Sequence, residues 1–560
     1  MAKPDLTSPL ISSQPSDPPH VILTVHESNS AHHRQQQSPN GIHHGNQNHH
    51  FYNETRCSSN LRNPFEFLGS GRLEVPPPTT VDPFRNHTHA IDGVYEVIKI
   101  VVCLPIAAVR LVLFGLCLAV GYIATKLALQ GWKDKENPMP RWRCRLMWIT
   151  RISARCILFS FGYQWIRRKG KPAPRETAPI VVSNHVSYID PIFYFYELFP
   201  TIVASESHDA LPFVGTIVRA MQVIYVNRFY PPSRKQAVNE IKRKAACDRF
   251  PRVLLFPEGT TSSGKALLSF QLGAFIPGYP VQPVIVRYPH VHFDQSWGDI
   301  SLAKLMFRMF TQFHNFMEVE YLPVVLPLEN QKENVSRFSE RTGHAIATAL
   351  NVVQTSYSFG DVLLRMEASS SNQDKPASYM VEMARVESLF HISSMEALEF
   401  LHRFLSMNPD SSGCVVYHNF LKALRLRDCT LSKEVFGFIN LEKNGSITFK
   451  QFLYASGHVR KQPLFRQACE LAFAECDVGR NECISAKELG DSLQLAIPNL
   501  NEHEIHELFK LFDVDGDESV SRDEFNTCLR KNPLLIALFS ASLLAGNSWR
   551  TGDDLLEEIV

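Results

Sequence analysis

The chain has 560 residues, which is enough for two or three folded units with sizeable cores. Its 57 Lys and Arg nearly balance its 56 Asp and Glu, so no global field favours nucleic acid as a partner. The 12 Cys form no C-x-x-C pair and show no metal-ligand spacing, a pattern typical of reduced, non-catalytic thiols in a protein that faces the cytosol.

Residues 1–93 are rich in His, Asn, Gln, Ser and Pro and contain few large aliphatic side chains. Such a segment cannot bury enough apolar surface to offset its ordering entropy, so we predict a disordered polar tail. The pairs at 43–44 and 49–50 are His-His, and they fit a solvated low-complexity tail better than a metal site. No positively charged segment with an adjoining apolar core opens the chain, so we expect no cleaved signal peptide.

Residues 94–130 are predicted to anchor the chain in a membrane. The run from Ile100 to Leu129 is the most apolar of the sequence and exceeds the roughly 20 residues that a bilayer requires. Pro105 and Arg110 interrupt it, and a charge at the centre of a spanning helix costs about 2.5–3.5 kcal/mol. Three interpretations stay open: one span over 111–129 with Arg110 reaching an interface, a re-entrant hairpin, and a buried core helix.

Residues 131–170 are predicted to form interfacial helices rich in basic and aromatic side chains. Met147 to Ile166 is apolar but carries Arg151 and Arg155, which fits a helix on the membrane surface or one packed on the following domain. Basic residues and Trp are enriched at the membrane–water boundary, and their excess here places the following chain in the cytosol. They are Trp132, Lys133, Lys135, Arg141, Trp142, Arg143, Arg145 and Trp148.

Residues 171–365 alternate short β-rich runs with helical patterns, which predicts an α/β domain with a mixed sheet flanked by helices. The candidate strands are Ile180–Ser183, Thr201–Ala204, Gln222–Val226, Val253–Phe256, Pro283–Arg287 and Glu318–Val324.

The first of these strands leads directly into His185, and Asp190 follows five residues later. A His at the end of a strand with a carboxylate nearby indicates a general base and the group that orients its imidazole. The spacing alone is weak evidence, since His87 and Asp92 share it within a polar segment that has no preceding strand. A capping His beside a structural Asp is the alternative.

Three further motifs follow other candidate strands. Arg228 ends one, and the planar fork of an Arg suits a phosphate, although a surface ion pair is the simpler interpretation. Glu258-Gly259-Thr260 follows the next strand, and alone it is a plain turn. Together, four ordered blocks resemble the glycerophospholipid acyltransferase family over about residues 140–330. They are Asn-His-Val-Ser-Tyr-Ile-Asp (184–190), 215–228, Phe-Pro-Glu-Gly-Thr (256–260) and Pro-Val-Gln-Pro-Val (280–284).

Residues 273–284 resemble the lysophosphatidylcholine acyltransferase branch in particular. The resemblance implies transfer of an acyl group from acyl-CoA to a free hydroxyl of a lysophospholipid. It makes His185 the general base and Asp190 its orienter, and it assigns Arg228 and the loop Glu258, Gly259 and Thr260 to the phosphoglycerol part of the acceptor. Acyl-CoA is then a co-substrate, and no cofactor is expected for the chemistry.

Residues 366–384 have the composition of a linker, and residues 385–530 read as helices separated by polar loops. The loop 513–524 matches a calcium-binding EF-hand loop, although Glu518 takes the usual Gly position at a cost of roughly 1–2 kcal/mol. Weaker loops at 408–419, 440–451 and 477–488 give starts that recur every 32 to 37 residues. The region resembles two pairs of mostly degenerate EF-hands. The candidate calcium ligands are Asp513, Asp515, Asp517, Ser519 and Glu524.

Residues 531–560 form a C-terminal tail with an apolar run at 534–545, too short to span and a candidate interfacial segment. The working hypothesis is a membrane-bound lysophospholipid acyltransferase of the plant type with EF-hands, acting on lysophosphatidylethanolamine or lysophosphatidylcholine, with modulation by calcium as a further expectation. Its expected partners are the lysophospholipid, acyl-CoA and the bilayer of the endoplasmic reticulum or Golgi, with the catalytic domain facing the cytosol. The alternative functions are a 1-acylglycerol-3-phosphate acyltransferase and a catalytically inert, calcium-responsive membrane scaffold. For the EF-hand region itself, the alternative to calcium binding is a structural module that has lost its ions.

Overall fold

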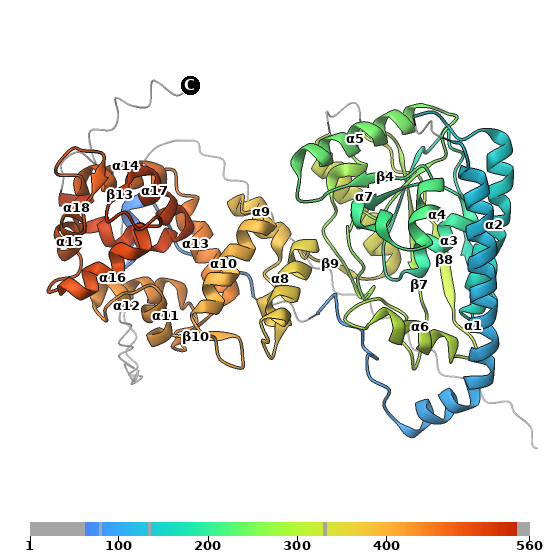
Figure 1. Ribbon diagram of the computed structural model, residues 1–560, viewed down its shortest axis with the longest axis horizontal. Coiled ribbons are helices and arrows are strands. Elements are labelled where there is room, and N and C mark those ends of the chain that lie inside the picture. Colours follow the sequence, from blue (N-terminus) through green and yellow to red (C-terminus); the bar gives the residue numbers. More distant parts are fainter. Residues whose placement is uncertain (1–61, 78–80, 133–135, 329–332, 546–560) are drawn as a thin grey trace, which may run out of the picture. The chain divides into compact units, whose positions relative to one another are not determined.

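The computed structural model of the protein describes residues 62–77, 81–132, 136–328 and 333–545 (Figure 1). The first 61 residues of the predicted tail, with their His pairs, lie outside the described residues, as do Lys133, Lys135 and residues 546–560.

A seven-stranded mixed sheet forms the centre of the predicted α/β domain, and the predicted fold class is confirmed. The strand order is β1-β8-β7-β2-β5-β3-β4, and every neighbouring pair is parallel except β7 and β8. β2 lies in the middle of the sheet, and all four of its residues are buried. The strands are β1 (Ile166–Lys169), β2 (Ile180–Ser183), β3 (Thr201–Ser205), β4 (Ile224–Val226), β5 (Val253–Leu255), β7 (Val281–Arg287) and β8 (Met317–Tyr321).

Helices cover both faces of this sheet (Figure 1). Because side chains alternate along a strand, Val181 of β2 faces one core while Ile180 and Val182 face the other. α2, α3 and α6 contribute to the first core and α5 and α7 to the second. The helices are α2 (Arg141–Ser160), α3 (Ile189–Glu197), α4 (Val214–Ala220), α5 (Pro231–Ala246), α6 (Leu302–Phe310), α7 (Val335–Leu350) and α8 (Phe359–Ser370).

β1 was not among the predicted strands and falls within the predicted interfacial segment. Its last three residues are charged and exposed, Arg167, Arg168 and Lys169. They lie on an edge strand, where charged side chains discourage pairing with another chain. A period-2 apolar pattern is therefore missing, which is why the sequence does not reveal this strand.

α1 (Val94–Leu129) is one continuous helix that runs through Pro105. The segment therefore does not form the re-entrant hairpin that was one of the three interpretations. Among the described residues it is the one helix long and apolar enough to cross a membrane. It packs along α2, where the hydroxyl oxygens of Thr125 and Thr150 lie 3.1 Å apart. Most of its large aliphatic side chains are exposed.

The single-span interpretation puts Arg110 at a membrane interface, where its side chain would be exposed, and the structure differs from this expectation. Its guanidinium is buried and donates to the backbone carbonyls of Phe310, Gln312 and Phe313 at the end of α6. Five donors on a planar group can satisfy several carbonyls at once, so this Arg holds the middle of α1 against the α/β domain.

The prediction of disorder is wrong for residues 62–77 and 81–93, which are packed. Phe65 and Leu68 are completely buried in the core of the C-terminal module, and the Phe65 and Phe438 rings lie 4.9 Å apart. Asn86 is completely buried and donates to the carbonyls of Asp294 and Ser296 at 3.1 and 2.7 Å. A few buried residues are enough to hold these segments in place. The average composition of residues 1–93, on which the prediction of disorder rests, does not reveal them.

The C-terminal module is built from helix–loop–helix units in two pairs, as predicted. Within each pair the loops are joined by a short antiparallel ladder, Val415 opposite Ile447 and Ile484 opposite Val520. The helices are α9 (Met383–Phe390), α10 (Ser394–Ser406), α11 (Tyr417–Ala423), α12 (Thr430–Ile439), α13 (Phe449–Arg460), α14 (Phe465–Cys476), α15 (Ala486–Gln494), α16 (Glu502–Phe512) and α17 (Arg522–Lys531). The strands are β10 (Cys414–Val416), β11 (Ser446–Thr448), β12 (Cys483–Ile484) and β13 (Val520–Ser521).

Two predicted irregular segments are structured. The linker at 366–384 contains the end of α8, and the buried Asp361 of α8 accepts from the backbone N–H groups of Val381 and Met383, each at 2.9 Å. The apolar run at 534–545 is not interfacial. Its residues 534–539 are buried in the module's core, where the Phe539 ring packs 5.2 Å from that of Phe525.

Candidate active site

The end of β2 is fixed by Asn184, which is buried and pairs with the backbone of β7. Its side-chain amide donates to the carbonyl of Val286 at 3.0 Å and accepts from the Val286 N–H at 2.8 Å. The chain then leaves the sheet at His185 and enters α3 at Ile189. The predicted base therefore stands where the central strand ends, at the edge at which parallel sheets gather their sites.

His185 and Asp190 are brought together, as the motif predicts. Nδ1 of His185 lies 2.9 Å from Oδ2 of Asp190, whose side chain is completely buried. The same carboxylate oxygen accepts from the N–H groups of Val186 and Ser187 at 2.8 and 2.9 Å. An ionised carboxylate only accepts, so Nδ1 carries the hydrogen and Nε2 keeps a free lone pair for a proton. The imidazole is stacked on the Phe256 ring, with centroids 4.1 Å apart.

Tyr288 was not singled out in the sequence, and it completes the hydrogen bonds to Asp190. It follows β7 directly, and its phenolic hydroxyl donates to Oδ1 of Asp190. Burial raises the pKa of Tyr288 well above its usual value, so the hydroxyl keeps its proton and acts as a donor. A Tyr at the end of the strand beside β2 is the signal that identifies it, once the strand order is known.

Glu258 is completely buried and contacts the backbone of the loop that carries His185. Its Oε1 accepts from the His185 N–H at 2.8 Å and its Oε2 from the Leu268 N–H at 3.1 Å. Burial raises the pKa of Glu258 to about 8. Both oxygens are thus occupied by the protein itself, and Glu258 acts on the site through the position of His185.

Gly259 and Thr260 continue the turn after Glu258. The Gly259 N–H donates to the carbonyl of Phe256 at 3.0 Å, and its φ of 72° is a conformation that favours glycine. Thr260 is partly exposed beside it.

Arg228 lies in the turn after β4, with its guanidinium over the ring of Phe359 at 4.5 Å from the centroid. Burial lowers the pKa of Arg228. No carboxylate within the described chain pairs with it, and it makes no direct contact with His185 there. A partly desolvated guanidinium with free donors is suited to an oxyanion.

Comparison with known proteins agrees with this geometry. The acyltransferase family profile matches residues 166–287, and the EF-hand domain pair profile matches residues 466–529. Lysophospholipid acyltransferase LPEAT2 of Arabidopsis thaliana is 64% identical over 547 residues, covering 97% of this chain and 99% of that protein. Lysophosphatidylcholine acyltransferase of Drosophila melanogaster is 31% identical, and the match covers 80% of this chain and 85% of that protein. Lysophosphatidylcholine acyltransferase 2 of Mus musculus is 28% identical, and the match covers 83% of this chain and 86% of that protein.

The chain belongs to the lysophospholipid acyltransferase family.

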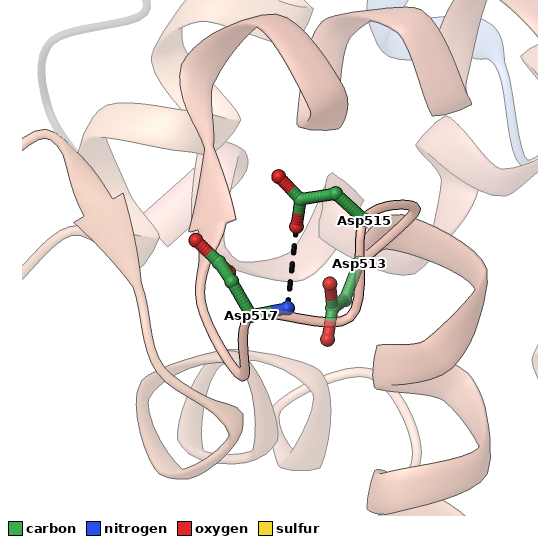
Figure 2. A group of neighbouring side chains, drawn as sticks. All are labelled: Asp513, Asp515 and Asp517. Carbon is green, nitrogen blue, oxygen red and sulfur yellow. Dashed lines mark hydrogen bonds between the residues drawn. The ribbon is translucent and has the colours of Figure 1, made fainter.

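This acyltransferase carries the candidate calcium ligands in the loop between α16 and α17. Figure 2 shows that Asp513, Asp515 and Asp517 project from one turn, and carboxylate oxygens of the three lie within 4.8 Å of one another. The Ser519 hydroxyl donates to Asp517 at 2.9 Å. Glu524 accepts from the N–H groups at 514 and 515, which places its carboxylate at the open side of the loop. Such an oxygen set fits a hard divalent cation.

The Glu518 prediction is confirmed, since its φ is 64° at the position where calcium loops usually have Gly. The upstream loop 477–488 has the same φ of 64° at its sixth residue, Glu482, but its third position, where a calcium loop has an oxygen ligand, is Gly479. Asp477 accepts from the N–H groups of Asn481 and Glu482 at 3.0 Å each. In the acyltransferase this loop therefore keeps the EF-hand geometry with fewer oxygen ligands.

Proposed function

We propose that this acyltransferase moves an acyl group from acyl-CoA to the free hydroxyl of a lysophospholipid, with lysophosphatidylethanolamine as the main acceptor and lysophosphatidylcholine as the second. The 64% identity to a relative named LPEAT2 over nearly the whole chain supports the headgroup. The pairing of His185 Nδ1 with the buried Asp190 carries the chemistry.

In the proposed reaction, Nε2 of His185 takes the proton of the acceptor hydroxyl as its oxygen attacks the thioester carbonyl. The carbon–sulfur bond then breaks, and the CoA thiolate receives the proton from the imidazolium. Asp190 stabilises that imidazolium and holds the ring in position. A glycerol hydroxyl is a poor nucleophile at neutral pH, and a positioned base contributes typically 10²–10⁴-fold.

Arg228 is proposed to bind the phosphate of the acceptor. Its guanidinium is held by the Phe359 ring and keeps its N–H donors free of carboxylates among the described residues. Gly259 and Thr260, in the turn that begins at Phe256, are proposed to contribute to the same phosphoglycerol site.

The reaction is tested with His185→Ala, using His402→Ala as the matched control. His402 has a largely exposed side chain that, within the described residues, pairs with Glu367 alone, so its loss changes the His content and leaves the site intact. Acylation of a mixture of lysolipids that differ in headgroup should fall about 10²-fold or more in the first variant and stay unchanged in the second. Equal turnover in the two variants contradicts the proposal, and preference for lysophosphatidate assigns the alternative acceptor.

We infer that α1 holds the enzyme on one side of the membrane and does not cross it. Residues on both sides of α1 belong to one folded unit, since Arg308 of α6 donates to the carbonyl of Thr88, which lies before α1. α2 does not return across a bilayer either, because Arg151 donates to the carbonyls of Tyr196 and Glu197 in the catalytic domain. The exposed aliphatic side chains of α1 remain to enter one leaflet.

This attachment leaves the catalytic domain on the cytosolic face of the endoplasmic reticulum or Golgi. The exposed Trp142 and Trp148 of α2 are residues that the membrane–water boundary selects. A glycosylation acceptor sequence inserted after Gln130 in microsomes should stay unmodified, whereas the same sequence in a luminal reporter is modified. Glycosylation of the inserted sequence contradicts the one-sided attachment.

Calcium is proposed to bind at the loop 513–524. Asp513, Asp515, Asp517 and Glu524 would supply carboxylate oxygens to the ion. Because Glu524 lies in the first turn of α17, its contact with the ion would join the loop to that helix. When bound, the ion would supply charge that holds α16 and α17 at a fixed angle, and the chemistry at His185 does not require it.

A further inference from the structure

A cleft of about 460 Å³ lies in the EF-hand module, away from the calcium loop, lined by α10, α14, α17 and the last residue of α13 (helices labelled in Figure 1). Its floor contains Phe400, Phe465 and Cys469, which are all buried. This volume falls within the roughly 300–1,000 Å³ typical of small-molecule sites.

Positive charge dominates the walls. Five cations face three carboxylates, an excess of two positive charges: Arg403, Arg460, Arg466, Arg530 and Lys531 against Glu396, Glu399 and Glu470. The carboxylates are already engaged. Arg460 pairs with Glu396 at 3.0 Å, Arg403 lies 3.8 Å from Glu399, and Glu470 accepts from an amide.

Three of the cations therefore have no carboxylate of their own. Within the described chain no ion pair includes Arg466, Arg530 or Lys531, and all three are exposed along the rim. Exposed cations on one face of a helix are common, so their number alone does not identify a site. Buried polar atoms of the cleft supply a second observation.

Two buried polar atoms of the cleft lack partners among the described residues. Asn526 is 8% exposed, and its Nδ2 donates to Glu470 at 3.0 Å, but its Oδ1 accepts no hydrogen bond. Nη1 of Arg403 is buried and donates none. Leaving such groups unpaired is costly, and each one in a folded protein has a physical reason. One atom requires a donor and the other an acceptor.

We propose that this cleft binds a polyol phosphate, either a soluble compound or the headgroup of a phosphorylated inositol lipid. Its phosphate oxygens accept from Arg403, Arg466 and Lys531, and a neighbouring hydroxyl donates to Oδ1 of Asn526. A bare carboxylate satisfies the cations but not the amide oxygen. The apolar floor accommodates the carbon ring or chain, since neither Phe400 nor Phe465 offers a polar atom.

The cleft shares α17 with the calcium loop. Glu524 is the third residue of α17, whereas Asn526, Arg530 and Lys531 follow along the same helix. The two sites nevertheless use different side chains, so binding of the phosphate compound is measured with calcium held constant. The proposal is independent of the catalytic assignment, because no residue of the acyltransferase domain lines the cleft.

The test uses the full chain in detergent micelles and isothermal titration with inositol trisphosphate, with inorganic phosphate as the second probe. Vesicles of phosphatidylcholine with and without a phosphorylated phosphatidylinositol form the third arm. The variant is Arg466→Ala with Lys531→Ala, and the matched control is Lys422→Ala with Lys487→Ala, two exposed cations on α11 and α15 outside the cleft. All four positions are exposed, so both variants are expected to fold.

The wild type and the control should bind inositol trisphosphate, and the cleft variant should bind at least about tenfold more weakly because it loses two charge-assisted contacts. Stronger binding to the inositol lipid vesicles than to the soluble compound assigns the lipid headgroup, and the reverse assigns a soluble ligand. Equal affinity of the cleft variant and the control, or binding of inorganic phosphate alone, overturns the proposal. So does wild-type protein that binds none of the probes.

Discussion

Tyr288 donates its phenolic hydrogen to Oδ1 of Asp190, while Oδ2 of the same carboxylate holds Nδ1 of His185 at 2.9 Å. With the two backbone N–H groups of the turn, four donors surround one completely buried carboxylate. The tyrosine therefore helps to fix the orientation of the carboxylate that positions the imidazole of His185.

Tyr288→Phe should lower kcat about tenfold, because the buried carboxylate loses one charge-assisted bond worth roughly 1.5 kcal/mol or more. KM for both substrates should stay unchanged, since the hydroxyl touches Asp190 and not the substrates' proposed positions. Steady-state kinetics with each substrate varied in turn measures both quantities.

The control for this prediction is Tyr163→Phe. Tyr163 is also completely buried, its ring lies 6.1 Å from that of Tyr288, and its hydroxyl donates to Gln295 at 2.6 Å without contacting Asp190. This variant should lose stability with little change in kcat. If both variants lower kcat equally, Tyr288 acts only through packing.

Glu258→Gln should flatten the pH dependence of unfolding. Burial raises the pKa of Glu258 from 4.5 to about 8, so the folded protein binds this proton more tightly than the unfolded chain. Between about pH 4.5 and 8 the folded state holds a proton that the unfolded state releases, and stability therefore falls as pH rises through this window. Gln keeps an acceptor and removes the titration. Urea unfolding at about pH 5 and about pH 8, near the two ends of this window, measures how the free energy of unfolding changes in each protein.

The stability contribution of Glu258 is fully present below pH 4.5 and is lost by pH 8. Asp361, whose pKa burial raises to about 6, contributes with the same sign and is present in both proteins, so it cancels in the comparison. Parallel curves for the wild type and Glu258→Gln would show that the buried Glu is ionised when folded.

Asp513→Ala combined with Glu524→Ala should abolish calcium binding to the EF-hand module, because the loop loses its first and last carboxylates. Calcium titration followed by calorimetry measures this on the full chain. Asp410→Ala is the control, since Asp410 lies in a degenerate upstream loop and accepts hydrogen bonds from Ser412 and Cys414. Binding that survives the double substitution but not the control would place the ion upstream.

Several features of this protein follow from the sequence alone because their parts are neighbours in the chain. His185 and Asp190 are five residues apart, so one strand–turn–helix places them in contact whatever the rest of the fold does. The calcium loop is equally local, and its twelve residues include their own turn and the cap of α17. The alternation of apolar runs likewise predicts the sheet, whose central strand is buried on both faces.

Tertiary structure decided what depends on contacts between distant residues. Tyr288 reaches Asp190 across 98 residues, and Arg110 reaches its carbonyl partners across about 200, because β7 and α6 happen to lie beside the site and beside α1. The segment around Phe65 and Asn86 is ordered only because two separate cores supply the burial that its own composition lacks. A pattern along the chain reports local preference, whereas burial and hydrogen bonding between distant segments exist only once the chain has folded.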